Sequence, residues 1–113
     1  MNTKRQGALG VAKAVDYYTD QGYAVFVPVS DVSRFDLVVE KDGLLKRVEV
    51  KTTSATKGEV MLRTRGGNQS WSGESKRISP TDCDEVFCYN VNSKNFAIYS
   101  SVELEGRNSV TLH

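Results

Sequence analysis

The stretch RFDLVVEKDGLLKRVEVK, over residues 34–51, constrains the fold more than any other part of the sequence. Apolar and charged residues alternate on both sides of Asp42-Gly43. An Asp-Gly pair between two alternating segments is the strongest short-range signal for a β-hairpin with a two-residue loop. The sequence therefore predicts two antiparallel strands, at about residues 35–40 and 45–52, joined by this turn.

The register set by this turn gathers charged side chains on one face of the hairpin. Asp36 comes to lie opposite Glu49, and Lys51 shares the face of Glu49 because side chains alternate along a strand. Two carboxylates directly opposite each other repel, so the arrangement costs stability unless something compensates it. The other face carries apolar residues that can enter a core, namely Leu37, Val39, Val48 and Val50.

Two explanations account for this charged face. In the first, the face is solvated and Lys51 merely relieves the repulsion between the acids. In the second, Asp36 and Glu49 hold a divalent cation, since Mg²⁺ prefers one or two carboxylates and takes further ligands from water and substrate phosphate. A neighbouring lysine would then orient the attacking water or stabilise charge developing on a phosphate. The second explanation predicts phosphodiester hydrolysis.

A helix is predicted before the hairpin, over residues 4–21. Thr3 is its expected N-cap, with Gln6 reaching back as the partner in a capping box, and Gly22 its expected stop. Apolar residues recur at helical spacing at Leu9, Ala12 and Val15. Gly7 and Gly10 weaken the first turns but allow another backbone to come close.

The remaining sequence predicts mainly strands. They are expected at residues 23–30, 59–65, 84–91 and 95–100. Pro28 places the end of the first of these at an edge or a bulge. A polar loop covers residues 66–76, a short helix is capped by Ser100 or Ser101, and nothing is predicted after Gly106. This order predicts an α/β or α+β sheet with helical cover.

Composition narrows the class of protein. The 113 residues are enough for one domain, over residues 1–113, and 39% hydrophobic with 26% charged residues is typical of a soluble globular protein. A net charge of +1 does not by itself indicate a nucleic-acid partner. No apolar run is long enough to span a membrane, and no signal peptide is expected, because no apolar stretch follows the basic residues of MNTKRQGALG. Cys83 and Cys88 fit neither a disulfide framework nor a zinc site, so a reduced cytoplasmic protein is expected.

The hairpin resembles the active-site hairpin of the PD-(D/E)XK nuclease superfamily. The signature of that superfamily is an Asp at the start of one strand and Glu-X-Lys on the next, seen here as Asp36 and Glu49-Val50-Lys51. RQGALG is similar to the glycine-containing start of the helix that precedes the core in such nucleases. The later stretch SPTDCDEVFCYNVNSKNFAIYS is loosely similar to the subgroup of group I intron homing endonucleases and archaeal Holliday junction resolvases.

This resemblance implies a restriction-endonuclease-like α/β core, with a central mixed sheet flanked by helices. It implies that Asp36, Glu49 and the Val50 carbonyl ligate Mg²⁺, for which Mn²⁺ can substitute, and that Lys51 positions the attacking water. The implied substrate is DNA, and cutting both strands implies a homodimer or higher homo-oligomer. A homing-endonuclease-like enzyme of prokaryotic, phage or archaeal origin is the leading interpretation, and a junction resolvase is the alternative.

The sequence departs from the family pattern in two places. Related nucleases often carry a Glu in the first helix, just after the second glycine, where this chain has Val11. Its nearest helical acid is Asp16, more than one turn later. Phe35 stands where the Pro of the signature is written. A catalytically inactive DNA-binding domain therefore remains an alternative, as does a structural domain with the acids as surface charge.

Residues that would contact DNA follow the hairpin. The basic candidates are Lys57, Arg63, Arg65, Lys76 and Arg77. In the polar loop, Trp71 is of the type that stacks on bases, and Asn68 and Gln69 of the type that pairs with adenine edges. In the alternative interpretation, Trp71 folds back as an apolar anchor and the arginines form a solvated strand face. Thr52 and Thr53 either donate to a phosphate or serve as β-formers, and we favour the latter.

Overall fold

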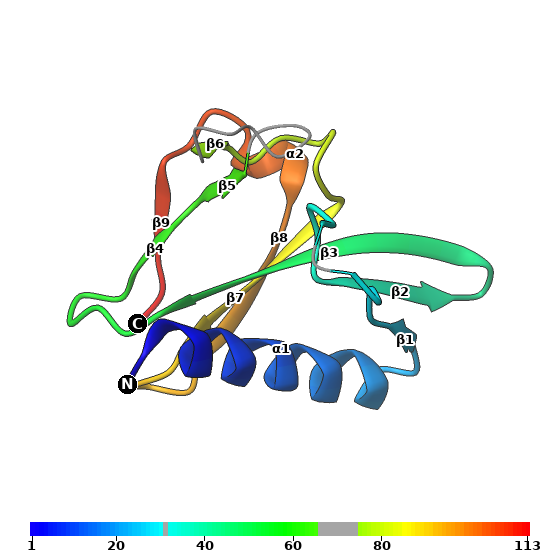
Figure 1. Cartoon of the computed structure of the whole chain (residues 1–113), viewed down its shortest axis with the longest axis horizontal. Coiled ribbons are helices and arrows are strands. Elements are labelled where there is room, and N and C mark those ends of the chain that lie inside the picture. The colour runs from blue at the N-terminus through cyan, green and yellow to red at the C-terminus, as the bar shows by residue number, and fades with distance from the viewer. Residues whose placement is uncertain (31, 66–74) are drawn as a thin grey trace.

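The computed structural model describes residues 1–30, 32–65 and 75–113. A five-stranded sheet has the order β1-β2-β3-β7-β8, and helix α1 (Thr3–Asp20) runs along one of its faces (Figure 1). The strands of this sheet are β1 (Ala24–Phe26), β2 (Leu37–Lys41), β3 (Leu44–Thr53), β7 (Glu85–Asn90) and β8 (Phe96–Ser100). Strand β3 pairs parallel with β7 and every other pair is antiparallel, so the sheet is mixed, as predicted.

The predicted hairpin register is confirmed. Lys41 lies opposite Leu44 and Leu37 opposite Val48, around a turn in which Asp42 and Gly43 have φ of 54° and 82°. Positive φ at both central residues is what this class of two-residue turn requires. The ladder ends at Leu37, while β3 continues to Thr53. Strand β3 therefore extends beyond its partner β2.

The start of α1 differs from the prediction. Asn2 is the N-cap, and its side-chain oxygen accepts a hydrogen bond from the Arg5 backbone N–H at 2.8 Å. Thr3 is the first helical residue, and Gln6 does not reach back to the cap. The Gln6 amide instead donates to the Thr52 hydroxyl at 3.4 Å. Asn2 takes the N-cap position instead of Thr3 because asparagine is at least as favourable as threonine at an N-cap. At the other end, Gly22 with φ of 90° follows the helix, as expected of a stop.

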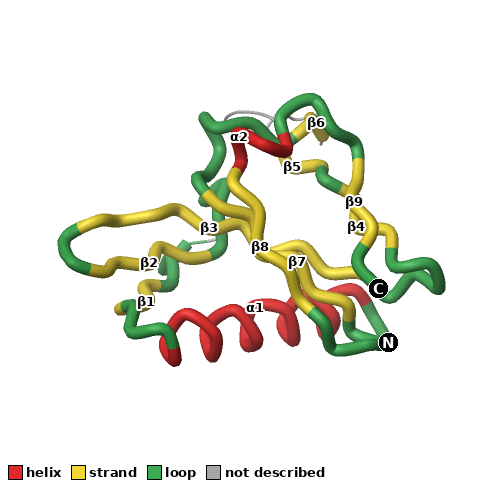
Figure 2. The backbone as a smooth tube through the Cα atoms, turned by 180° about the vertical axis from the view of Figure 1, so that it is seen from behind, coloured by secondary structure: helices red, strands yellow, loops and turns green. Residues whose placement is uncertain are grey.

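A second layer covers the face of the sheet opposite α1 (Figure 2). Two small sheets and a short helix form it: β4 (Glu59–Met61) with β9 (Ser109–Thr111), β5 (Arg63–Arg65) with β6 (Ser75–Arg77), and α2 (Ser101–Leu104). Ser100 caps α2 in a complete capping box with Glu103, as one of the two predicted options. Each face of the large sheet thus has its own cover.

Several predicted strand boundaries are wrong. The strand expected at 59–65 is interrupted at Leu62, whose N–H donates to the Asn108 carbonyl at 2.9 Å, and its halves join different sheets. The strand expected at 23–30 stops at Phe26, before Pro28, because proline cannot continue a ladder. The loop expected at 66–76 gives its last two residues to β6, and residues 66–74 lie outside the described part. Strand β9 was not predicted.

Buried side chains form two clusters, one on each face of the large sheet. The cluster beneath α1 contains Ala14, Tyr18, Leu37, Val39, Val48, Phe87 and Tyr89, with Val50 packed against it. The cluster beneath the second layer contains Val60, Leu62, Ile78, Cys83, Val86, Cys88, Leu104 and Val110. The four apolar hairpin residues therefore enter the core from one face, as predicted, and this face meets α1. The charged face of the hairpin is turned toward the second layer.

Candidate active site

Asp36 is the residue immediately before β2, at the point where β3 continues without its β2 partner. Its backbone N–H donates to the carbonyl of Val48 at 2.9 Å, and Val48 is already the ladder partner of Leu37. The predicted pairing of Asp36 opposite Glu49 is therefore not part of the ladder, which stops one residue earlier. Its side-chain Oδ2 accepts a hydrogen bond from the Val50 N–H at 2.7 Å. The N–H and C=O of one residue point to the same side of a strand. The Val50 carbonyl is therefore directed to the side of β3 on which Asp36 lies.

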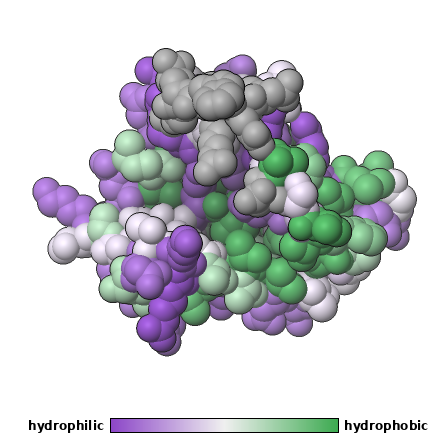
Figure 3. Space-filling model, in the orientation of Figure 1, coloured by the Kyte–Doolittle hydropathy of each residue, from purple (hydrophilic) through white to green (hydrophobic). Residues whose placement is uncertain are grey.

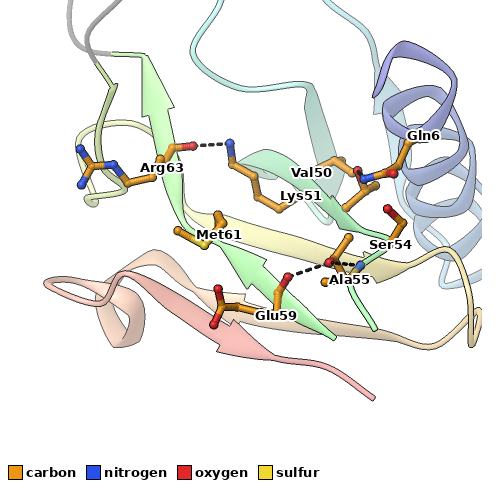
Figure 4. A pocket seen from close by; sticks show the side chains of 10 residues that line it. Gln6, Val50, Lys51, Ser54, Ala55, Glu59, Met61 and Arg63 are labelled. Atoms are coloured by element: carbon orange, nitrogen blue, oxygen red, sulfur yellow. Dashed lines mark hydrogen bonds between the residues drawn. The ribbon is translucent and has the colours of Figure 1, made fainter. Parts of the chain in front are cut away.

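Glu49 and Lys51 form an ion pair on the face of β3 that meets the second layer. Lys51 Nζ lies 3.2 Å from Glu49 Oε1. Only 5% of Glu49 is exposed, whereas 23% of the Lys51 side chain is. Strand β5 lies beside the pair: the Arg63 backbone carbonyl accepts from Lys51 Nζ (Figure 4), and Thr64 helps to lower the pKa of Glu49. The predicted sharing of a face is confirmed.

The two acids interact electrostatically. Burial raises the pKa of Glu49, opposed by the ion pair with Lys51, and the nearby Asp36 charge raises it further. Burial also raises the pKa of Asp36, while the Val50 N–H and Lys51 lower it. Burial is the largest contribution for both carboxyls, so one lysine does not compensate the desolvation of two negative charges. The site is short of positive charge.

This donor set fits a divalent cation. Glu49 Oε2 is buried and has no hydrogen-bond partner among the described residues. A buried carboxylate oxygen without a partner is costly, and a cation would satisfy it. In the part of the chain that the structure describes, no three His, Cys, Asp or Glu residues cluster as a metal site. Two carboxylates and a carbonyl with open positions suit Mg²⁺ better than metals that need a complete protein cage.

A cavity of about 630 Å³ opens beside Lys51, along the part of β3 that has no β2 partner (Figure 4). Gln6 of α1 reaches its rim, with the backbone segment from Val50 to Ala55 along one side and Arg63 at the end near Lys51. Sequence reasoning gave Gln6 only a capping role and missed this position. The absence of an acid at position 11 was the available signal, because it raises the question of which other polar residue of the helix faces the hairpin.

Val11 lies at the position where related nucleases carry an acid. It is half-buried and lines a smaller cavity of about 280 Å³ together with Phe35 and Asp36. This helical position and the first candidate metal-binding acid therefore line the same cavity. The side chain there is apolar, so α1 adds no carboxylate to the site at this position.

The predicted DNA-contact residues fall into three groups. Lys57 is exposed in the turn before β4, and the Arg63 side chain points away from Lys51 (Figure 4). Two others have partners within the chain: Lys76 Nζ lies 2.7 Å from Asp82 Oδ2, and Arg77 Nε donates to Asn108 Oδ1 at 2.9 Å. The side chain of Arg65, and residues Asn68, Gln69 and Trp71, lie outside the described part. DNA contact by these residues stays a prediction.

Comparison with known proteins identifies the class. The family model "PD-(D/E)XK endonuclease" matches residues 1–113, and the chain belongs to this family of nucleases. Protein 5.3 of Escherichia phage T7 is 31% identical over 93 residues, which are 82% of this chain and 75% of that protein. The solved structure of a bacterial homing endonuclease has the same fold, with a TM-score of 0.81 at 22% identity, over 100% of this chain and 79% of that one.

Proposed function

We propose that this endonuclease hydrolyses DNA with a divalent cation, Mg²⁺ or in its place Mn²⁺, held by Asp36, Glu49 and the Val50 carbonyl. The buried, unpartnered Oε2 of Glu49 carries this proposal, because an uncompensated carboxylate oxygen beside a second acid calls for positive charge. Family membership supports the assignment. A solvated charged face does not account for it, since Glu49 is only 5% exposed.

The chemistry follows from the placement of these groups. A bound divalent cation would supply a Lewis acid that neutralises phosphate charge and lowers the pKa of water. Lys51, which is partly exposed at the edge of the larger cavity, can donate from Nζ to the attacking water or to a phosphate oxygen. Asp36 is fixed by the Val50 N–H, so its second oxygen is oriented without rearrangement. Such preorganisation is a large part of electrostatic catalysis.

A homing-endonuclease-like target, a long specific duplex, is the substrate that we favour. The likeness in fold to a homing endonuclease over the whole chain supports it. A junction resolvase remains the second candidate. A DNA-binding domain that has lost catalysis is the third, and the apolar Val11, which lines a cavity together with Asp36, supports it.

Cleavage of both strands by one active site per chain leads us to propose a homodimer or higher homo-oligomer. Exposed apolar residues on the side that carries the β2–β3 hairpin support this (Figure 3): Phe26, Val27, Val29, Val32, Leu44 and Leu45. Contiguous exposed apolar surface commonly marks an interface.

Among the described residues no helix is long and apolar enough to cross a bilayer. We propose a cytoplasmic setting and a phage or prokaryotic origin, consistent with the phage relative.

The test is incubation of the protein with a DNA pool containing long heterogeneous duplex and a four-way junction, with Mg²⁺ or with chelator. We expect cleavage of duplex with Mg²⁺ and none with chelator. Cleavage of the junction alone would replace the homing-like target by a resolvase. DNA binding in chelator without any cleavage in Mg²⁺ would contradict the proposed enzyme and support the binding-only domain.

A further inference from the structure

Strand β3 has an open edge where it continues beyond β2. The Val50 N–H points to the β2 side of the strand, because it is bonded to the Asp36 side chain. Backbone groups of residues two apart in a strand point to the same side. The N–H and C=O of Thr52 are therefore directed to this edge, where the ladder with β2 has already ended. The Thr53 carbonyl points the other way and accepts from the Val91 N–H at 3.0 Å.

The larger cavity lies along this open edge (Figure 4). Thr52 lines the cavity, and the Gln6 amide of α1 donates to the Thr52 hydroxyl at 3.4 Å. The Thr52 methyl group faces Gly10, where an added Cβ would collide with it, so the hydroxyl is left on the side of Gln6. Both side chains are half-buried. A backbone N–H, a hydroxyl and an amide are thus brought together beside one cavity.

The residues around this cavity favour an anion as its ligand. Lys51, which pairs with Glu49, also lines the cavity, and Arg63 lies at the same end. Among the described residues that line it, the only acid is Glu59, whose carboxylate points away from Gln6 (Figure 4). Backbone N–H groups and the side chains of glutamine and threonine commonly donate to DNA phosphates. A phosphate group therefore fits the donors that the cavity presents.

We propose that this cavity binds the phosphate next to the scissile phosphate, with the Thr52 N–H and hydroxyl and the Gln6 amide as uncharged donors. This site rests on the proposed function, the hydrolysis of DNA, and adds a place for the neighbouring phosphate. The Val50 carbonyl and the Thr52 N–H are two residues apart on one strand, a span comparable to the spacing of neighbouring phosphates in a DNA strand. Lys51 lies between the two positions and contributes positive charge to both.

The experiment compares Gln6→Ala and Gln6→Glu with the parent. The readout is the affinity for duplex DNA in chelator, measured by fluorescence anisotropy over a range of salt concentrations. Loss of a hydrogen bond to a charged group typically weakens binding by about 10-fold or more. We expect a loss of that size for Gln6→Ala and a larger one for Gln6→Glu, because a carboxylate repels phosphate. The salt dependence of Gln6→Ala should stay parental, since it reports contacts made by basic residues.

Gln21→Glu is the matched control. Gln21 is exposed at the other end of α1, so the same change of charge lies away from the cavity and should leave the DNA affinity unchanged. Parental DNA affinity in folded Gln6→Ala and Gln6→Glu would overturn the inference and leave the proposed function standing. A change of oligomeric state without a change of DNA affinity would overturn it in favour of a second copy pairing with the open edge. A parent that binds no DNA would overturn the proposed function itself.

Discussion

Without a metal, the buried charges of Asp36 and Glu49 lower the free energy of unfolding. Burial raises the pKa of both carboxyls above their values in the unfolded chain. At any pH between the unfolded-state pKa and the folded-state pKa of a carboxyl, the native state therefore binds more protons than the unfolded state. Their contribution to stability is fullest below about pH 4, the ordinary range of these carboxyls, and is lost as the pH rises through the folded-state pKa values.

Asp36→Asn should therefore stabilise the metal-free protein at neutral pH. The asparagine oxygen can still accept from the Val50 N–H, but its burial removes no charge from water. In chelator at pH 7, we expect a higher melting temperature than the parent, with the difference shrinking toward pH 4. Mg²⁺ should raise the melting temperature of the parent and not that of the variant. A less stable variant in chelator at pH 7 would contradict this account.

At the scale of elements, α1 meets β3 at Gly10. A Cβ added at this position would collide with the Thr52 methyl group and approach Val50 Cγ1 to 3.1 Å. The sequence predicted a close approach through the small residues of this helix, and Gly10 provides it. Gly7 faces open space, and an added Cβ there would have nothing within 4 Å. Gly10, and not Gly7, therefore sets the distance between the helix and the active-site strand.

Gly10→Ala should destabilise the protein by about 1–3 kcal/mol, the usual cost of overpacking. It should also lower cleavage activity, because the helix must move away from the strand that carries Lys51. Gly7→Ala is the matched control and should stabilise by about 0.5–1 kcal/mol through helix propensity. Urea unfolding measures the change in stability for both substitutions. Equal effects of the two substitutions would show that the Gly10 contact does not matter.

Local signals explain which elements could be predicted. The hairpin register follows from Asp42-Gly43 and from alternation, both within a few residues, and it sufficed to place Glu49 and Lys51 on one face. Asp36 lies one residue outside the ladder, where the register no longer holds. The pairing of β4 with β9 has no such signal, because three-residue strands about 50 positions apart meet only through tertiary packing. The contact of the Arg63 carbonyl with Lys51 depends on that same second layer, so nothing local in the sequence indicated it.

At the scale of the whole molecule, a net charge of +1 gives little general attraction to DNA. Binding must therefore depend on a few local phosphate contacts. Each such contact contributes about 0.9 to the slope of log affinity against log salt. Lys57 is exposed in the turn between Ala55 and Glu59, which both line the larger cavity, and is a candidate for one of them.

Lys57→Gln should lower the magnitude of that slope by about one unit in chelator. Lys41→Gln is the control, because Lys41 lies at the far end of the β2–β3 hairpin and donates to the Gln21 carbonyl at 2.9 Å. It should leave the slope unchanged. Fluorescence anisotropy with duplex DNA over a range of salt concentrations provides the measurement. An unchanged slope for Lys57→Gln would show that Lys57 makes no phosphate contact.

The most direct test of the active site is single-turnover DNA cleavage in Mg²⁺ by the parent, Lys51→Ala and Lys46→Ala. Lys46 is a lysine of the same strand that pairs with Glu85 at 3.0 Å, away from the acids. Removing a group that stabilises charge in the transition state typically costs about 10²- to 10³-fold in rate. We predict a loss of that size for Lys51→Ala and a rate close to the parent for Lys46→Ala. Parental activity in folded Lys51→Ala would contradict the assignment of Asp36, Glu49 and Lys51 as the catalytic centre.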